Sequence, residues 1–119
     1  MIDTQLCKAK SISSGQWVYG YYVKGLDINN KEIHVIFEPA TVFYSHGETD
    51  GFEEIDSKTL CRCTGSHDKN GKLIFENDLL GHHLNRVEWL NGEYCINGDS
   101  PLSMMCNYFE VIGNIFDKN

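Results

Sequence analysis

RVEWLNGEYCI (residues 86–96) specifies an antiparallel hairpin more directly than any other segment of this 119-residue sequence. Two short runs rich in β-branched and aromatic residues flank the dipeptide Asn91-Gly92. Asn and Gly accept the positive φ angles that a tight two-residue hairpin turn requires. We therefore predict two paired strands, over residues 86–90 and 93–96.

The same turn chemistry recurs outward from this hairpin. Asn70-Gly71 and Asn97-Gly98 are two further Asn-Gly pairs, and Asn29-Asn30 precedes a strand expected over residues 32–37. The segment YFEVIGNIF (residues 108–116) predicts a closing strand that bends at Gly113. Repeated short strands with turns between them favour antiparallel pairing throughout the chain.

The segment GQWVYGYYVKG (residues 15–25) alternates in the way that is typical of a half-buried strand. Trp17, Tyr19 and Tyr21 fall on one face, and the intervening residues fall on the other. Gly20, in the middle of the strand, predicts a bulge or a close approach of another backbone.

Helix finds little support in the sequence. No window of ten or more residues combines a helical period with caps at both ends, and only residues 56–63 predict a short helical turn, with Asp56 or Ser57 as its N-cap. The predicted fold is therefore mainly β, built of antiparallel strands and hairpins with little helix. The predicted core is Trp17, Val18, Val35, Phe37, Leu60, Ile74, Phe75, Val87, Trp89, Ile96, Val111 and Ile115.

The length predicts a single domain over residues 1–119. Within it we expect a β-meander over residues 10–45 and a small SH3-like or barrel-like unit over residues 60–116. An acidic, glycine-bearing stretch over residues 45–57 is expected to form an exposed loop between them.

The charge balance disfavours nucleic acid as a partner. The net charge is −7, and only residues 1–24 are net positive, with three Lys and one Asp. A phosphate backbone is repelled by such a chain, so sequence-independent nucleic-acid binding is not expected. Absence of an apolar leader or membrane-length segment predicts a cytoplasmic protein, and five Cys, an odd number, fit reduced thiols.

Three blocks of the sequence resemble the YopX family of phage and prophage proteins: GQWVYGYYV near the start, IDSKTLCRCTGSHDKNGKLIFENDLL in the middle and EVIGNIF at the end. They occur in the family's order and cover most of residues 10–116. The resemblance implies a small phage or prophage protein of mainly β structure, and it implies no activity. The residues that it marks as family motif are Thr64, Gly65, Asp68, Asn70, Gly71, Glu76, Asn77, Asp78 and Gly113.

Three departures from the family pattern are informative. Asn77 stands where the family usually has glycine, and Asn is the next residue best able to hold a positive φ. Ser66-His67 replaces a common Leu-Lys, so these two side chains are not expected to carry a shared function. Cys63 replaces an aromatic residue, which points to packing and not to sulfur chemistry.

Two clusters have the composition of a ligand site, and for both we favour a structural interpretation. Asp68, Glu76 and Asp78 are hard oxygen ligands, but the calcium-loop pattern fails and turn chemistry explains them better. A zinc site is disfavoured because a one-residue gap separates the two thiols and the adjacent histidines of a strand point apart. This second cluster is Cys61, Cys63, His67, His82 and His83. We expect no metal and no cofactor.

An enzyme is not expected, because no nucleophile elbow, phosphate-binding loop or dinucleotide fingerprint occurs. The sequence favours a non-enzymatic protein-interaction module, whose partner is an unidentified host or phage protein or a second copy. The alternative is a small β-barrel that binds single-stranded nucleic acid on the strand face of Trp17, Tyr19 and Tyr21. A further hypothesis is that an acidic run mimics nucleic acid and contacts a basic host protein. An ordinary solvated loop is the simpler interpretation of this run. Its residues are Glu48, Asp50, Glu53, Glu54 and Asp56.

Overall fold

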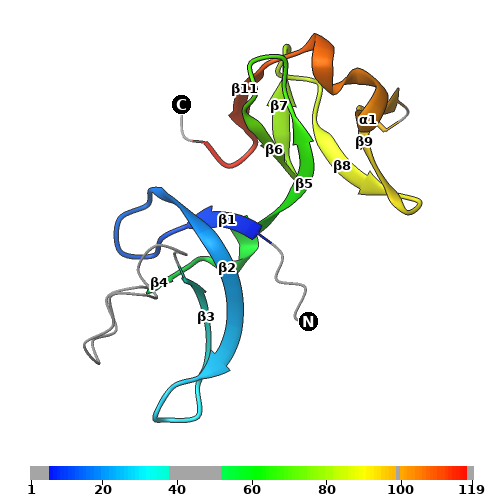
Figure 1. Cartoon of the computed structure of the whole chain (residues 1–119). Coiled ribbons are helices and arrows are strands. Elements are labelled where there is room, and N and C mark those ends of the chain that lie inside the picture. The colour runs from blue at the N-terminus through cyan, green and yellow to red at the C-terminus, as the bar shows by residue number, and fades with distance from the viewer. Residues whose placement is uncertain (1–5, 38–51, 99, 118–119) are drawn as a thin grey trace. The chain divides into compact units, whose positions relative to one another are not determined.

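A computed structural model describes residues 6–37, 52–98 and 100–117. Every strand pairing in it is antiparallel, and the helices are a turn or so long, so the predicted mainly β fold is confirmed. The chain forms two compact units, Met1–Arg62 and Cys63–Asn119, which divide within one strand (Figure 1). None of the helices in the described ranges is long and apolar enough to cross a membrane.

The first unit is a twisted sheet in the order β4-β3-β2-β1, with the start of β5 beside β1. The strands are β1 (Leu6–Lys10), β2 (Trp17–Leu26), β3 (Glu32–Phe37), β4 (Phe52–Glu54) and β5 (Cys61–His67). The predicted Asn turn joins β2 to β3, with Asn30 at a φ of 60°. Asp27 fixes this turn, because its Oδ1 accepts the backbone N–H of Asn29 and of Lys31 at 2.8 and 2.9 Å.

The core of the first unit lies against one face of this sheet. Four buried side chains form it, and three partly buried ones pack against them: Cys7, Ala9, Ile36 and Ile55, with Val18, Tyr22 and Leu60. Gly20 belongs to the same face, and a Cβ built on it would lie 2.1 Å from the carbonyl oxygen of Phe37. The close backbone approach predicted at Gly20 is therefore present, and it allows β2 and β3 to pack tightly.

The second unit contains the rest of β5 and three small antiparallel arrangements: β5 with β6, β7 with β11, and β8–β9–β10. The added elements are β6 (Leu73–Phe75), β7 (Asp78–Leu80), β8 (Val87–Leu90), β9 (Glu93–Ile96), β10 (Ser100–Pro101), helix α1 (Leu102–Met105), a 3₁₀ helix (Cys106–Tyr108) and β11 (Val111–Asn114). The predicted β8–β9 hairpin is confirmed, with both Asn91 and Gly92 at positive φ. One cluster forms the core: Ile74, Leu80, Val87, Ile96, Leu102 and Cys106.

Most residues of the predicted core are buried or half-buried, but the prediction is wrong for two of them. Val35, Ile74, Phe75, Val87 and Ile96 are buried, whereas Trp17, Val18, Phe37, Leu60 and Val111 are half-buried. Trp89 is 46% exposed and Ile115 is 38% exposed, so their assignment to the core is wrong. Trp89 lies toward the turn of its hairpin and packs edge-on against Tyr94, with ring centroids 4.7 Å apart. Ile115 follows the last residue of β11 and leaves the sheet.

The acidic segment is only partly a loop. Residues 45–51 of the expected loop, and residues 38–45 of the expected meander, lie outside the described residues. Phe52–Glu54, however, is strand β4, because it pairs with the outer side of β3. The helical turn predicted after it is a 3₁₀ helix (Ser57–Thr59), and Asp56 caps it by accepting the backbone N–H of Lys58 at 3.1 Å.

Candidate binding face

The face of the first sheet that points away from its core is lined by aromatic side chains. Alternation along β2 puts Trp17, Tyr19, Tyr21 and Val23 on this face. Tyr21 pairs with Phe37 on β3, and Phe37 pairs with Phe52 on β4, which continues the row across three strands. We call this surface the aromatic face: Trp17, Tyr19, Tyr21, Val23, Phe37 and Phe52. The three residues predicted to share a strand face therefore do so.

Much of the aromatic face is accessible. Tyr19 is 47% exposed, Val23 is 44% exposed and Phe52 is 37% exposed, while the other three side chains are half-buried. The rings of Phe37 and Phe52 are tilted by 41° with centroids 5.5 Å apart, so they support one another across the outer strand pair. A patch of exposed and half-buried rings on one face of a sheet is typical of a surface that another macromolecule covers.

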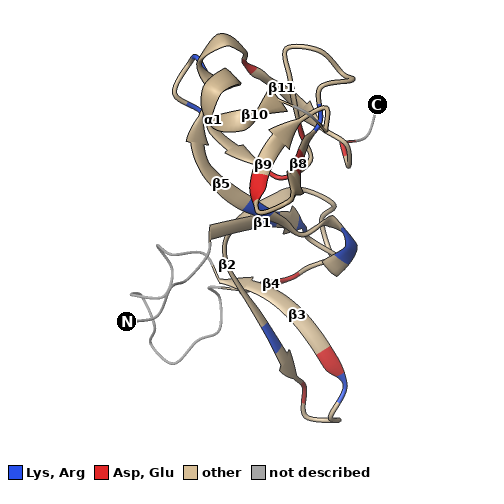
Figure 2. Ribbon diagram, turned by 90° about the vertical axis from the view of Figure 1, so that its right-hand side faces the viewer, with Lys and Arg blue, Asp and Glu red and all other residues tan. Residues whose placement is uncertain are grey.

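Charge is confined to the margins of this face. The ammonium groups of Lys8 and Lys10 on β1 lie 4.6 and 5.0 Å from the ring centroid of Trp17. Glu54 on β4 lies on the same face, because it pairs with Val35, which in turn pairs with Val23. The side chain of Glu54 is exposed. Figure 2 shows β2 and β3 free of charge except for one basic and one acidic band near their turn.

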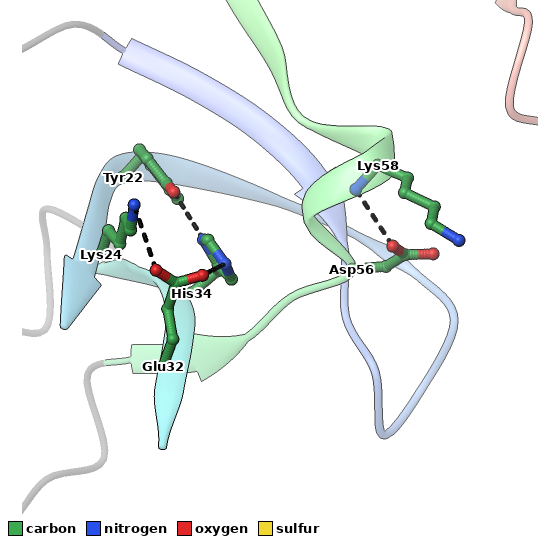
Figure 3. A network of polar contacts seen from close by, with 6 residues as sticks. All are labelled: Tyr22, Lys24, Glu32, His34, Asp56 and Lys58. Carbon is green, nitrogen blue, oxygen red and sulfur yellow. Dashed lines mark hydrogen bonds and ion pairs between the residues drawn. The ribbon is translucent and has the colours of Figure 1, made fainter. Parts of the chain in front are cut away.

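A polar network, which the sequence did not single out, braces the opposite side of the β2–β3 hairpin (Figure 3). The Tyr22 hydroxyl lies 2.6 Å from Nδ1 of His34, whose Nε2 lies 3.3 Å from Glu32. Glu32 also pairs with Lys24 at 3.1 Å; the hydrogen bond raises the pKa of Lys24 and lowers that of Glu32. Both charged groups are largely exposed, so this pair adds little stability and mainly fixes the hairpin's conformation.

The acidic run does not form a single surface over its described part. Glu53 and Glu54 lie on opposite faces of β4, and Glu53 accepts the hydroxyl proton of Ser11 at 2.7 Å. Asp56 is the cap of the 3₁₀ helix. Glu48 and Asp50 lie outside the described residues. Glu53 and Glu54 therefore cannot act together as one phosphate-like row.

The family-motif residues lie in the second unit, where Asp68 is the centre of a turn. Its side chain is buried, and Oδ1 accepts the backbone N–H of Asn70 and of Lys72, each at 2.9 Å. Oδ2 accepts the N–H of Val111 at 2.9 Å, which ties the turn to β11. Burial raises the pKa of Asp68, but the three backbone donors outweigh burial and hold this pKa below its usual range.

Acid is therefore expected to remove the contribution of Asp68 to stability. Because the folded-state pKa is depressed, the contribution is complete above the unfolded-state pKa of about 3.9 and disappears as pH falls through the lower folded-state value. Urea unfolding of the wild type and of Asp68→Asn should differ clearly at pH 6, and the difference should shrink as pH falls through the depressed folded-state pKa of Asp68. A difference that stays constant over this range would contradict the assigned role.

Asp78 and Asn114 form a second, fully buried polar link. Oδ2 of Asp78 accepts the backbone N–H of Phe75 at 2.8 Å, and Oδ1 accepts from Nδ2 of Asn114 at 2.9 Å. Nδ2 of Asn114 also contacts the carbonyl oxygen of Glu76 at 3.2 Å. This link joins β11 to the turn between β6 and β7, which lie 36 or more residues earlier in the chain.

The remaining motif residues also shape turns. Asn77 has a φ of 68°, as expected of a residue in place of glycine, and its side-chain oxygen accepts Nε–H of Arg86 at 2.9 Å. The Thr64 hydroxyl donates to the carbonyl of Ile74 at 2.8 Å. Left-handed backbone occurs at Gly65 and Gly71, and β11 is irregular between Val111 and Gly113. These contacts and backbone angles give Asn77, Thr64, Gly65 and Gly71 structural roles.

The residues considered as metal ligands are not assembled in the described part of the chain. Among residues 6–37, 52–98 and 100–117, no three His, Cys, Asp or Glu side chains lie close enough to hold a metal ion. All five cysteines are free thiols. An open groove of about 490 Å³ in the second unit is lined by Leu79, His83, Ile112, Gly113, Asn114, Ile115 and Asp117. There the Asp117 carboxylate accepts the backbone N–H of Asn114 at 2.9 Å, so it serves the fold.

A family model described as "YopX protein" matches residues 9–119, which include the aromatic strand and the whole of the second unit. No curated protein matches the chain.

Proposed function

The chain belongs to the YopX family, and we propose that it is a non-enzymatic protein-interaction module, the role that its sequence favours, and that it binds through the aromatic face. The observation that carries this proposal is the group of aromatic rings across β2, β3 and β4, of which Tyr19 and Phe52 are exposed. We further propose that the protein works in the cytoplasm of a bacterial host, as a product of a phage or prophage.

The composition of the aromatic face supports a protein partner. Interface centres are enriched in Tyr, Trp and Phe and depleted of charge, with charged groups at the rim. Here the centre is aromatic and aliphatic, and Lys10 and Glu54 stand at the margins. Buried rings at such a centre typically carry most of the binding free energy, about 2 kcal/mol or more for each that is truncated.

Affinity capture with matched variants tests the proposal. The double variant Tyr19→Ser/Val23→Ser removes the two most exposed side chains of the aromatic face. The control, Leu26→Ser/Ile28→Ser, removes apolar side chains that are 65% and 99% exposed near the turn of the same hairpin. Wild type and control should retain the same protein partner, and the face variant should bind it at least tenfold more weakly, a loss of about 1.4 kcal/mol. Equal binding by all three proteins would refute the assignment of the face.

A second candidate, single-stranded nucleic acid, is favoured by one observation. Lys8 and Lys10 lie beside Trp17, next to Tyr19, and cations beside stacking rings suit a single strand. The net charge of −7 opposes it, so we place it second. Binding of a labelled oligonucleotide that falls steeply with salt and is lost in Lys10→Glu would promote this candidate over the first.

A further inference from the structure

We propose that the aromatic face binds the same face of a second copy of this chain. This inference rests on the proposed function of the aromatic face. Two copies would pack face to face across a two-fold axis, with their strands crossing at a large angle. The proposal specifies the partner and the pairs of residues that meet.

Opposite charges stand at opposite corners of the aromatic face. Lys10 lies on β1 and pairs with Trp17, the first residue of β2. It therefore stands on one side of the aromatic face, at the level of the start of β2. Glu54 lies on β4, the outer strand on the other side, at the level of Val23 and Val35 further along β2. The row Tyr21–Phe37–Phe52 runs between these two corners.

A two-fold axis that lies in the plane of contact can bring these corners together. In such an interface, if residue i contacts residue j of the partner, then j contacts i as well. When the axis exchanges the two corners, Lys10 of each copy meets Glu54 of the other, and the pair forms twice. This arrangement crosses the two sheets steeply, which is the orthogonal form of face-to-face sheet packing.

The chemistry of the face favours a second copy over a partner of strong charge. The face is apolar at its centre, with basic and acidic groups separated at its margins, so it complements itself. A strongly basic partner would meet Lys10 on it, and a strongly acidic partner would meet Glu54. Self-association also buries the accessible rings of Tyr19 and Phe52 twice.

Sedimentation equilibrium of the full chain tests the pairing by charge exchange. Lys10→Glu and Glu54→Lys each place like charges together, and each should weaken the dimer at least tenfold. The combined variant Lys10→Glu/Glu54→Lys restores opposite charges and should recover an affinity within about threefold of the wild type. Lys24→Glu, on the opposite side of the sheet, is the matched charge control and should leave the dimer intact. Circular dichroism of each variant verifies that it is folded.

Each alternative result overturns the proposal in a distinguishable way. A wild type that stays monomeric at millimolar concentration, while the aromatic face still captures another protein, removes the second copy and leaves the proposed function standing. A dimer that tolerates both Tyr19→Ser and the charge variants lies elsewhere on the chain. A dimer that is lost in Tyr19→Ser but is indifferent to the charge variants uses this face without the crossed arrangement.

Discussion

Gly20→Ala should destabilise the first unit by about 3 kcal/mol or more, at the upper end of what overpacking costs. A Cβ at this position would lie 2.1 Å from the carbonyl oxygen of Phe37, 2.8 Å from its carbonyl carbon and 2.9 Å from Cγ2 of Ile36. Two of these atoms belong to backbone, so no side-chain rotation relieves the contact. β2 and β3 would have to separate, and the row of rings that crosses them in the aromatic face would be disturbed.

Gly25→Ala is the control for this substitution. Gly25 lies in the same strand, and a Cβ there would have nothing within 4 Å. The alanine should be neutral or stabilise by a few tenths to about 1 kcal/mol, because it reduces the freedom of the unfolded chain. Urea unfolding of both variants, followed by circular dichroism, measures the difference. Equal stability of the two variants would mean that β2 and β3 are not packed as described.

Asp78→Ala should destabilise the second unit by about 3 kcal/mol, because it removes a buried acceptor that two donors share. The backbone N–H of Phe75 would lose its bond to Oδ2 of Asp78, and Nδ2 of Asn114 would keep only the carbonyl oxygen of Glu76 among the two acceptors described above. Asp78 itself is fully buried, so water cannot readily replace the carboxylate. Loss of this link should also loosen β11, which would appear as faster amide hydrogen exchange at residues 111–114.

Glu93→Ala is the matched control, since it removes an exposed acidic side chain from the same unit. Its effect on the free energy of unfolding should stay within about 0.5 kcal/mol. Should Asp78→Ala prove as mild as this control, Asp78 would not be the link between β11 and the β6–β7 turn.

The hairpins were predictable because their causes are local. Asn91-Gly92 and Asn30 adopt positive φ for reasons that lie within a few residues of each turn. The pairing of Phe52–Glu54 with β3 was not predictable, because three residues in an acidic stretch carry no strand pattern of their own. Only the neighbouring strand makes them a strand.

The aromatic face illustrates the same limit. Alternation along β2 correctly puts Trp17, Tyr19 and Tyr21 on one side of the sheet. The alternation of the sequence alone does not show which side of the sheet the core covers. The covering residues on the core side include Ile55 and Leu60, which come from a segment with no strong apolar pattern. Likewise Asp68 and Asp78 could be assigned to turns, whereas their partners Val111 and Asn114 lie 43 and 36 residues away.

The most direct test of the central claim, that two copies of this protein associate through the aromatic face, is a dilution series of the wild type followed by proton–nitrogen NMR. The two indole N–H signals report on the two units separately, since Trp17 belongs to the aromatic face of the first unit and Trp89 is exposed in the second unit. We expect the Trp17 signal and the amides of Tyr19, Tyr21 and Val23 to shift with concentration, while the Trp89 signal stays fixed. Shifts confined to Trp89 and its hairpin would place the binding surface in the second unit and contradict the account.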